Sequence, residues 1–383
     1  MYNKCINPPI FAARRTASPV IAHITMEKIP LLRYIWRICR HETSCADTCI
    51  MTIHKTTEKQ NVIITGVRPS ANLTVANFVG SVIPLLDLQN EGRPISAFVA
   101  TMHGLTDREP SEIVPNVIEV VRDYLALGLD PKKVIMFDQR AVRKEVALLK
   151  LYLERHITIA RLLRVPALKD KLREGQTAEQ ASALLAEYPI MMAADILLQD
   201  ANLVPVGKDQ YAHIEATKEL ARAFNARYGD TLVVPEVLER NEPVNILALR
   251  GDGKMSKSKP DDAIFLTDNE ETLRKKIKRA ETADPGKKSE KIESLAFLGR
   301  ILSPARASDI DAILTRHRAG NKVMADFKEI LADIVVTFTT DFQKKRADVS
   351  TSSVQNILVD GNEIALTQAK TVLDRAEHAM RII

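Results

Sequence analysis

Short apolar runs and longer amphipathic stretches alternate along the chain from about residue 61. The runs at 61–66, 95–100 and 133–137 are rich in β-branched or apolar residues and are predicted to be strands. Apolar residues recur at helical spacing over 74–90 and 111–128, which predicts a helix after each of the first two strands. Strands that alternate with helices in this way form a parallel sheet that is buried on both faces. The sequence therefore predicts an α/β fold that binds its ligands at the carboxyl ends of the strands.

The beginning of the chain differs in composition from the rest of its 383 residues. Residues 1–60 contain nine Lys and Arg against four Asp and Glu, which accounts for the whole formal net charge of +5. They also contain all four cysteines and the only tryptophan. We therefore expect residues 1–55 to be a divergent, disordered extension, with Met51 as a natural alternative start. The remaining chain is neutral overall and has no apolar run long enough to cross a bilayer, so a nucleic-acid partner would need local basic patches.

Two other interpretations of this extension stay open. Cys39, His41, Cys45 and Cys49 could bind zinc, although they lack the paired Cys-x-x-Cys spacing of most structural zinc sites. The arginines of the extension, combined with few acidic residues, would also fit a mitochondrial presequence. The cysteine-free body of the chain fits a reducing cytoplasm, which is the location that we expect.

A lysine-rich loop lies in the sequence GDGKMSKSKPDD at 251–262. Its two glycines can adopt positive φ angles, and Lys254 and Lys257 lie about one helical turn apart. Met255 interrupts the polar run, and a purely solvated loop would not need it. The glycine and lysine spacing does not match a Walker loop. We interpret the segment as a mobile cationic loop that holds a polyphosphate during a reaction, and we expect a helix capped by Asp268 to follow.

The first connection from strand to helix, TGVRPSANLTVANFVG at 65–80, has the composition of a nucleotide-binding turn. Gly66, Pro69 and Ser70 indicate a turn, and Thr74 and Asn77 place polar groups at the start of the next helix. Free N–H groups at a helix start favour anions. This connection is the predicted position of a nucleotide.

A single carboxylate interrupts the apolar helical segment YPIMMAADILL at 188–198. Asp195 would be costly to bury without a hydrogen-bond partner. Tyr188 lies two helical turns before it and Met192 lies one turn before it, so all three share one face of the helix. A capping or ion-pairing role for Asp195 is one interpretation. A pocket for a flat ligand that donates a ring N–H or phenolic O–H is the other.

Several motifs together resemble one enzyme family. KMSKS at 254–258 is identical to the second signature of class I aminoacyl-tRNA synthetases. Together, YPIMMAADILL, VPVGKDQYAHIE and PSANLTVANFVG resemble the bacterial type of tryptophanyl-tRNA synthetase, over roughly residues 61–345. The first class I signature corresponds to Thr74 to Asn77. HITI at 156–159 looks like that signature, but we expect it to lie within a helix and discount it.

The resemblance implies a fold and a reaction. The fold would be a Rossmann-like parallel-sheet nucleotide-binding domain with a helical insertion, over 56–268, followed by a helical C-terminal tRNA-binding domain over 269–383. The protein would activate tryptophan with ATP and transfer it to the 3′ end of tRNA(Trp). Mg²⁺ would accompany the ATP, with no metal-binding side chains of the protein. The resemblance also implies a homodimer.

The resemblance also implies roles for individual residues. Lys254, Ser256 and Lys257 would be catalytic contacts to the phosphates, assisted by Lys171. The ATP site would consist of Arg68, Pro69, Ser70, Thr74, Ala76, Asn77, Gly207, Lys208, Asp209, Ile246, Lys254, Met255, Ser256, Lys257 and Ser258. Asp195 would accept the indole N–H, and the rest of the tryptophan pocket would consist of His103, Tyr188, Met192 and Gln210. A site that hydrogen-bonds a donor group rejects analogues that lack it.

The chain departs from the family pattern at several of these positions. Arg68 stands where the family has Gln, Ala76 where it has Gly, Thr101 where it has Asp and Ala167 where it has Gln. These changes leave open a paralog that activates a related amino acid or serves as an inhibitor-tolerant second copy. A non-catalytic RNA-binding regulator on the same scaffold is a third hypothesis. The intact lysine loop argues against it. A basic segment near 339–349 could contact a tRNA stem.

Overall fold

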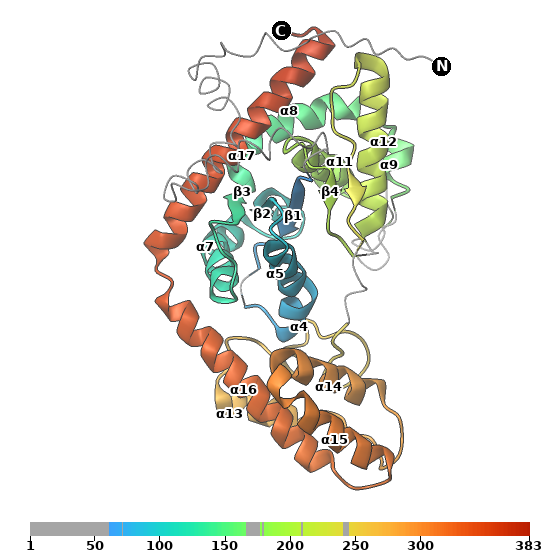
Figure 1. The fold of residues 1–383 in the computed structure, drawn as a ribbon. Helices are drawn as coiled ribbons and strands as arrows, with labels where there is room; N and C mark the ends of the chain where they lie inside the picture. Colours follow the sequence, from blue (N-terminus) through green and yellow to red (C-terminus); the bar gives the residue numbers. More distant parts are fainter. Residues whose placement is uncertain (1–60, 71, 166–176, 178–179, 208–209, 240–244) are drawn as a thin grey trace, which may run out of the picture. The chain divides into compact units, whose positions relative to one another are not determined.

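The computed structural model describes residues 61–70, 72–165, 177, 180–207, 210–239 and 245–383. All of them belong to one compact unit, Gln60–Ile383. At its centre is a five-stranded sheet, which Figure 1 shows surrounded by helices. The predicted boundaries at residues 55 and 268 stay predictions.

The sheet is wholly parallel, with the strand order β3-β2-β1-β4-β5. In register, Ile63 lies opposite Ile95, and Ile95 lies opposite Val134. All residues of β2 and β3 are buried, as the predicted burial on both faces requires. The predicted α/β fold and its first three strands are confirmed. The strands are β1 (Ile63–Val67), β2 (Ile95–Val99), β3 (Val134–Asp138), β4 (Leu203–Val204) and β5 (Glu236–Val237).

The helix predicted over 74–90 is present but changes its winding twice. It begins as α4 (Val75–Asn77), passes through a π-helical segment, η1 (Phe78–Val82), and continues as α5 (Ile83–Asn90). The N–H of Ile83 donates to the carbonyl of Phe78, five residues earlier. Pro84 follows at once and has no N–H to continue the α-helical hydrogen bonds, which explains a wider turn at this point.

Further helices cover the sheet and form the insertion. The prediction over 111–128 is confirmed by α7, and α11 packs against both α8 and α12. The interpretation of HITI as part of a helix is wrong: α8 ends at Glu154, His156 lies in a turn, and Thr158 caps the next helix. The helices are α6 (Thr101–Gly104), α7 (Pro110–Ala126), α8 (Arg143–Glu154), α9 (Ile159–Leu162), α11 (Ala183–Leu197) and α12 (Tyr211–Tyr228), with a 3₁₀ turn η2 (Gln139–Val142) after β3.

The C-terminal part of the chain is helical, as predicted. Three of its helices, α13, α14 and α15, pack against α16, and the last helix, α17, packs against β3 and α7 instead. The helix expected after the lysine loop is α13, but its cap is Asn269, whose side chain accepts from the N–H of Thr272. Asp268 instead accepts from the N–H of Phe265 and pairs with Lys276. The helices are α13 (Glu270–Arg279), α14 (Glu290–Leu302), α15 (Ala307–Arg318), α16 (Met324–Asp348) and α17 (Thr351–Met380).

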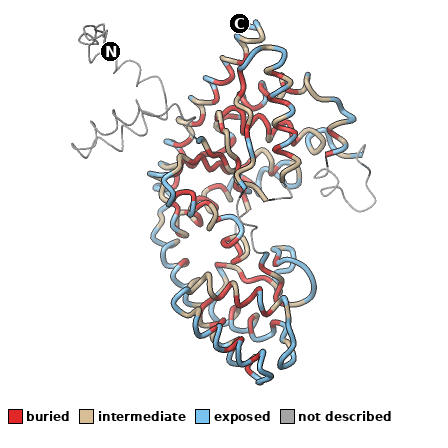
Figure 2. The backbone as a smooth tube through the Cα atoms, turned by 45° about the vertical axis from the view of Figure 1, so that its right-hand side comes forward, coloured by how far each residue is buried: buried red, intermediate tan, exposed pale blue. Residues whose placement is uncertain are grey.

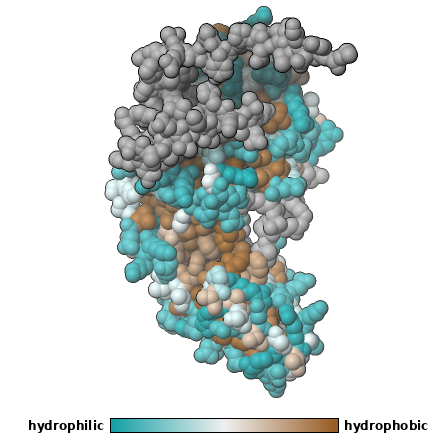
Figure 3. Space-filling view, viewed as in Figure 1, coloured by the Kyte–Doolittle hydropathy of each residue, from teal (hydrophilic) through white to brown (hydrophobic). Residues whose placement is uncertain are grey.

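A continuous apolar core links the sheet to the C-terminal helices. Figure 2 shows buried residues along the strands and again inside the bundle that α13 to α16 form. Phe78 of η1 packs against Phe338 of α16, with 4.9 Å between the ring centroids. On the face shown in Figure 3, hydrophobic residues gather around the middle, near α4 and α5. No helix of the described residues is long and apolar enough to cross a membrane.

A buried ion cluster joins α7 to the end of α16. The guanidinium of Arg346 lies 2.5 Å from the carboxylate of Asp123, which is almost fully buried, and also pairs with Glu119. Burial raises the pKa of Asp123 above its usual range, against the opposing effect of Arg346. Arg346 is therefore turned inward and does not belong to the basic patch expected near 339–349.

We expect Arg346→Leu to destabilise the protein by about 3 kcal/mol at pH 7, because it leaves the Asp123 carboxylate buried without its cation. Lys345→Ala, which removes an exposed pair with Asp341 on the same helix, should cost no more than about 0.5 kcal/mol. Urea unfolding measures both.

The deficit of Arg346→Leu should also depend on pH. Without Arg346 the pKa of Asp123 rises further in the folded state, whereas the unfolded state keeps the ordinary value of 3.8. The folded variant then binds a proton that the unfolded chain has lost, so its stability relative to the parent should recover as pH falls from 7 to 5. A deficit independent of pH over this range would mean that Asp123 does not carry the cost.

Candidate active site

A cavity of about 630 Å³ opens at the carboxyl ends of the central strands. Its wall includes Gly66 at the end of β1 and Ala100 just after β2. Six of the predicted site residues line it, namely Arg68, His103, Tyr188, Met192, Gly207 and Gln210. Segments far apart in sequence therefore meet at one edge of the sheet, where parallel-sheet proteins bind ligands.

Asp195 lies beside this cavity and is 4% exposed. Its carboxylate accepts hydrogen bonds from the amide of Gln139, at 2.9 Å and 2.8 Å to the two oxygens. The Nε2 atom of His103 lies 2.9 Å from Oδ2. The protein itself therefore supplies donors to Asp195, as a buried carboxylate requires.

Gln139 is a site residue that the sequence analysis missed. It is fully buried at the start of η2, directly after β3. Its Oε1 atom accepts from the backbone N–H groups of Met102 and His103, at 2.8 Å and 3.3 Å. One side chain thus holds the backbone of α6 and the carboxylate of α11 together. A lone Gln after a strand carries no sequence signal for this role, because its partners are distant in the chain.

Tyr188 and Met192 lie on the same helix as Asp195, as the spacing predicted. The hydroxyl of Tyr188 lies 2.6 Å from Nε2 of the buried His213 on α12. The rings of Tyr188 and His103 meet edge to face, with 6.3 Å between their centroids. The aromatic wall of the cavity is therefore held by side chains from three helices.

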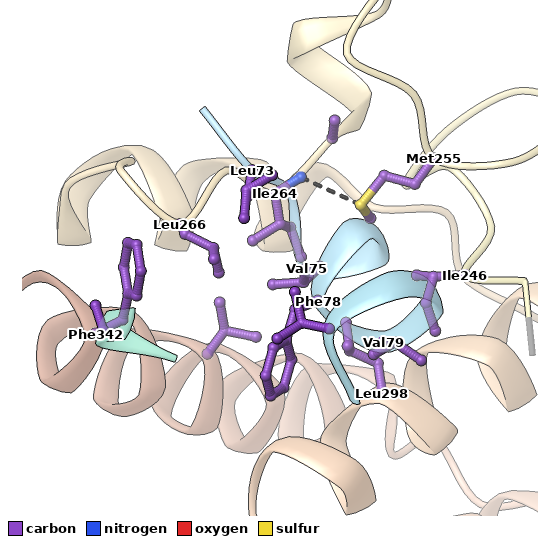
Figure 4. Packing of buried hydrophobic residues seen from close by; sticks show 14 of the residues in the cluster. Leu73, Val75, Phe78, Val79, Ile246, Met255, Ile264, Leu266, Leu298 and Phe342 are labelled. Atoms are coloured by element: carbon purple, nitrogen blue, oxygen red, sulfur yellow. Dashed lines mark hydrogen bonds between the residues drawn. The ribbon is translucent and has the colours of Figure 1, made fainter. Parts of the chain in front are cut away.

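The lysine loop is attached to the core through Met255. This side chain is buried, and its sulfur accepts a hydrogen bond from the N–H of Ile264. Figure 4 shows Met255 directed into the cluster that contains Val79 and Ile246. Met255 therefore anchors a loop whose Lys254, Ser256 and Ser258 are exposed. The glycines of the loop, at 251 and 253, have the expected positive φ angles of 66° and 96°.

Lys257 reaches from this loop to the connection after β1. Its Nζ atom donates to the carbonyl oxygen of Ser70 at 3.0 Å and lies 3.1 Å from the Ser70 hydroxyl. Burial, followed by the positive charge of Arg108, lowers the pKa of Lys257 to about 8. An anion bound here would offset both effects, because it neutralises a cation that is costly to desolvate.

Arg68 lies at the edge of the cavity but pairs with Asp107, at 2.8 Å. Both side chains are largely exposed. The positive charge of Arg68 at the edge of the cavity is therefore partly neutralised by an acidic neighbour.

Thr74 and Asn77 form a capping box at the start of α4. The Thr74 hydroxyl accepts from the N–H of Asn77, and the Asn77 side chain accepts from the N–H of Thr74. The N–H of Val75 donates to the carbonyl of Ile264. The N–H groups at the start of this helix, which we expected to bind an anion, thus donate hydrogen bonds within the protein instead.

The other predicted residues are placed as follows. Pro69 is buried and Ser70 half-buried in the connection after β1, Ala76 is half-buried in α4, and Ile246 is buried and accepts from the N–H of Met255. Lys171, Lys208, Asp209, Ala167 and the cysteines of the extension lie outside the described residues.

Comparison with known proteins identifies the family to which this fold belongs. The family model for class I tRNA synthetases (W and Y) matches residues 55–354. The chain belongs to this family. It is 33% identical to the tryptophan–tRNA ligase of Chlamydia caviae, over 85% of this chain and 96% of that protein, and 32% identical to that of Treponema pallidum, over 83% and 96%.

Solved structures agree with this membership. The tryptophanyl-tRNA synthetase of Campylobacter jejuni, complexed with ADP and tryptophan, matches with a TM-score of 0.72 and 28% identity, over 84% of this chain and 99% of that chain. That of Mycoplasma pneumoniae matches with a TM-score of 0.70 and 26% identity, over 84% and 98%. The Rossmann-like class I fold inferred from the motifs is confirmed.

The lowered pKa of Lys257 predicts that the binding of pyrophosphate depends on pH. Binding of inorganic pyrophosphate near pH 8 should take up about half a proton, because Lys257, with a pKa of about 8, is half protonated there and the anion raises its pKa. Titration calorimetry in two buffers of different ionisation enthalpy measures this uptake, and the affinity should weaken as pH rises through 8.

Two variants assign the proton. Lys257→Gln should abolish the uptake, whereas Lys259→Gln, which removes an exposed lysine two residues away, should retain it. Proton uptake that persists in Lys257→Gln would show that another group titrates.

Proposed function

We propose that this protein activates L-tryptophan with ATP and transfers the tryptophanyl group to the 3′ end of tRNA(Trp). The family membership and the tryptophan–tRNA ligases that resemble it over most of its length support this function. The observation that carries the assignment is the buried carboxylate of Asp195, held beside an aromatic cavity at the edge of the sheet.

The activation step requires charge neutralisation more than proton transfer. A carboxylate oxygen of tryptophan attacks the α-phosphorus of ATP, and the bond from that phosphorus to the bridging oxygen breaks. Pyrophosphate leaves with the electron pair, and Lys254 and Lys257 of the loop would stabilise its growing charge. Their place on a loop that Met255 anchors to the core, and that Lys257 joins to the connection after β1, supports this role.

The transfer step releases AMP. A ribose hydroxyl of the terminal adenosine attacks the carbonyl carbon of the adenylate, the bond to the phosphate oxygen breaks, and the hydroxyl proton goes to the departing phosphate or to water. The exposed Lys344 and Lys345 near the end of α16 remain candidates for a contact to the tRNA backbone.

Asp195 would distinguish tryptophan from other aromatic amino acids. A carboxylate has about four acceptor positions, and Gln139 and His103 occupy only part of this capacity. The indole N–H would add a charge-assisted hydrogen bond that phenylalanine cannot make. Met192, Tyr188 and His103 supply the apolar and aromatic surface on which the indole would pack.

Mg²⁺ would enter with ATP. Within the described residues, no group of three His, Cys, Asp or Glu side chains is placed to hold a metal ion. The ligands of Mg²⁺ would be phosphate oxygens and water, and the loop lysines would share the charge of the phosphates with it.

We expect tryptophan-dependent exchange of pyrophosphate into ATP, with tryptophan well ahead of tyrosine and phenylalanine. Lys254→Ala and Lys257→Ala should each reduce the exchange rate about a hundredfold, which is the scale of losing one preorganised transition-state contact. Asp195→Ala should lose most of the preference for tryptophan. A survey of all twenty amino acids tests the assignment, and a higher rate with any other amino acid would favour a paralog of altered specificity.

We also propose a homodimer that buries the outer surface of the insertion. Helices α8 and α9 both pack against α11, and they leave Leu151 57% exposed and Ile159 75% exposed. Leu148 of α8 and Leu184 of α11 are also exposed. Neighbouring exposed aliphatic residues are typical of a protein interface.

If this surface is the interface, Leu151→Glu together with Ile159→Glu should convert the dimer to a monomer in sedimentation at micromolar concentration. Val359→Glu places the same charge on an equally exposed aliphatic position of α17 and should leave the dimer intact. Dimers that persist in the double variant would locate the interface elsewhere.

A further inference from the structure

The C-terminal helix makes an unusually close contact with the edge of the sheet. Among the described strands, β3 is the last on its side, so one row of its backbone groups has no neighbouring strand there. Figure 1 shows α17 running past this strand, and the two elements are in extensive contact. The closest point is Gly361.

No other residue fits at position 361 without a shift of the helix. A Cβ atom placed on Gly361 would lie 1.8 Å from the carbonyl oxygen of Met136 and 2.7 Å from its carbonyl carbon. Both are backbone atoms of β3, so they cannot rotate away as a side chain could. The missing side chain allows the helix backbone to lie directly on the strand backbone.

The next residue of α17 hydrogen-bonds the end of the strand. The Oδ1 atom of Asn362 accepts from the N–H of Asp138 at 2.8 Å. Asp138 is buried, and its carboxylate accepts from the hydroxyl of Thr101 at 2.7 Å and from the N–H of Arg140 at 2.9 Å. The contact with α17 therefore fixes the point at which the chain leaves β3.

Gln139 follows Asp138 immediately. It holds the N–H groups of Met102 and His103 on one side and the carboxylate of Asp195 on the other. The path from α17 to the amino acid cavity thus runs through two consecutive residues, 138 and 139.

We propose that Gly361 and Asn362 of α17 are positioning residues for the amino acid site, acting on Asp195 and His103 through Asp138 and Gln139. The expected change in kinetics rests on the proposed function. The expected change in structure rests on the hydrogen bonds alone. A shift of Gln139 would displace the carboxylate that binds the indole and leave the lysine loop in place. Displacements of this kind typically cost one to two orders of magnitude.

The test replaces Asn362 with Leu, which has a similar volume and no acceptor. Its KM for tryptophan in the exchange reaction should rise about tenfold, with KM for ATP changed less than twofold. Asn362→Asp keeps an acceptor and should stay within about threefold of the parent. Gln368→Leu removes another hydrogen bond of the same helix, to Asp200, and should leave both KM values unchanged.

A second measurement does not depend on activity. Amide hydrogen exchange at Asp138, Met102 and His103 should accelerate in Asn362→Leu and not in Gln368→Leu, because only the first variant releases the chain of hydrogen bonds. Gly361→Ala should have the larger effect on both measurements. If it does not fold, Asn362→Leu carries the test.

The outcomes separate the two proposals. If the unmutated protein shows no tryptophan-dependent exchange, the proposed function fails, and amide exchange still decides whether α17 positions residues 102, 103 and 138. If Asn362→Leu only lowers the melting temperature and the amount of active enzyme, with unchanged KM for tryptophan and unchanged local amide exchange, α17 is a structural brace and the positioning role is wrong.

Discussion

A carboxylate that is removed from water needs donors close by, and most of the amino acid site follows from meeting that need at Asp195. Its donors come from two different segments, the amide of Gln139 after β3 and the imidazole of His103 in α6. Asp195 itself belongs to α11 of the insertion. Satisfying one buried charge therefore brings together segments that follow two strands and a helix more than fifty residues away in the chain.

The lysine loop, where we propose that the phosphates bind, is held differently. Its lysines stand on a loop with exposed hydroxyls, and the protein holds that loop at a few points, the buried sulfur of Met255 among them. Lys257 spans the gap to Ser70 and so links the loop to the connection after β1. A rigid, buried half suits recognition of a flat side chain, and a lightly held half suits an anion that must arrive and leave in each cycle.

Local patterns in the sequence predicted what depends on neighbours along the chain. The strands β1 to β3 and the long helices have clear periodicity, whereas β4 and β5 have two residues each and exist only through their pairing with β1 and with one another. Asp268 and Asn269 are both common helix-capping residues. Asp268 forms an ion pair with Lys276, and Asn269 caps the helix. Gln139 and the inward turn of Arg346 depend on tertiary partners, so no motif could reveal them.

The contact between α17 and β3 also bears on how the protein is made. Strand β3 is synthesised more than two hundred residues before the helix that covers its open edge, as the positions of Met136 and Gly361 show. Until that helix emerges, a strand of sequence VIMFD presents free backbone groups on which another nascent chain could pair. The sheet can form early in synthesis, but the edge of β3 is covered only when the last thirty or so residues have been made. A chain truncated before α17 would therefore lose a helix and would also expose a strand edge that promotes aggregation.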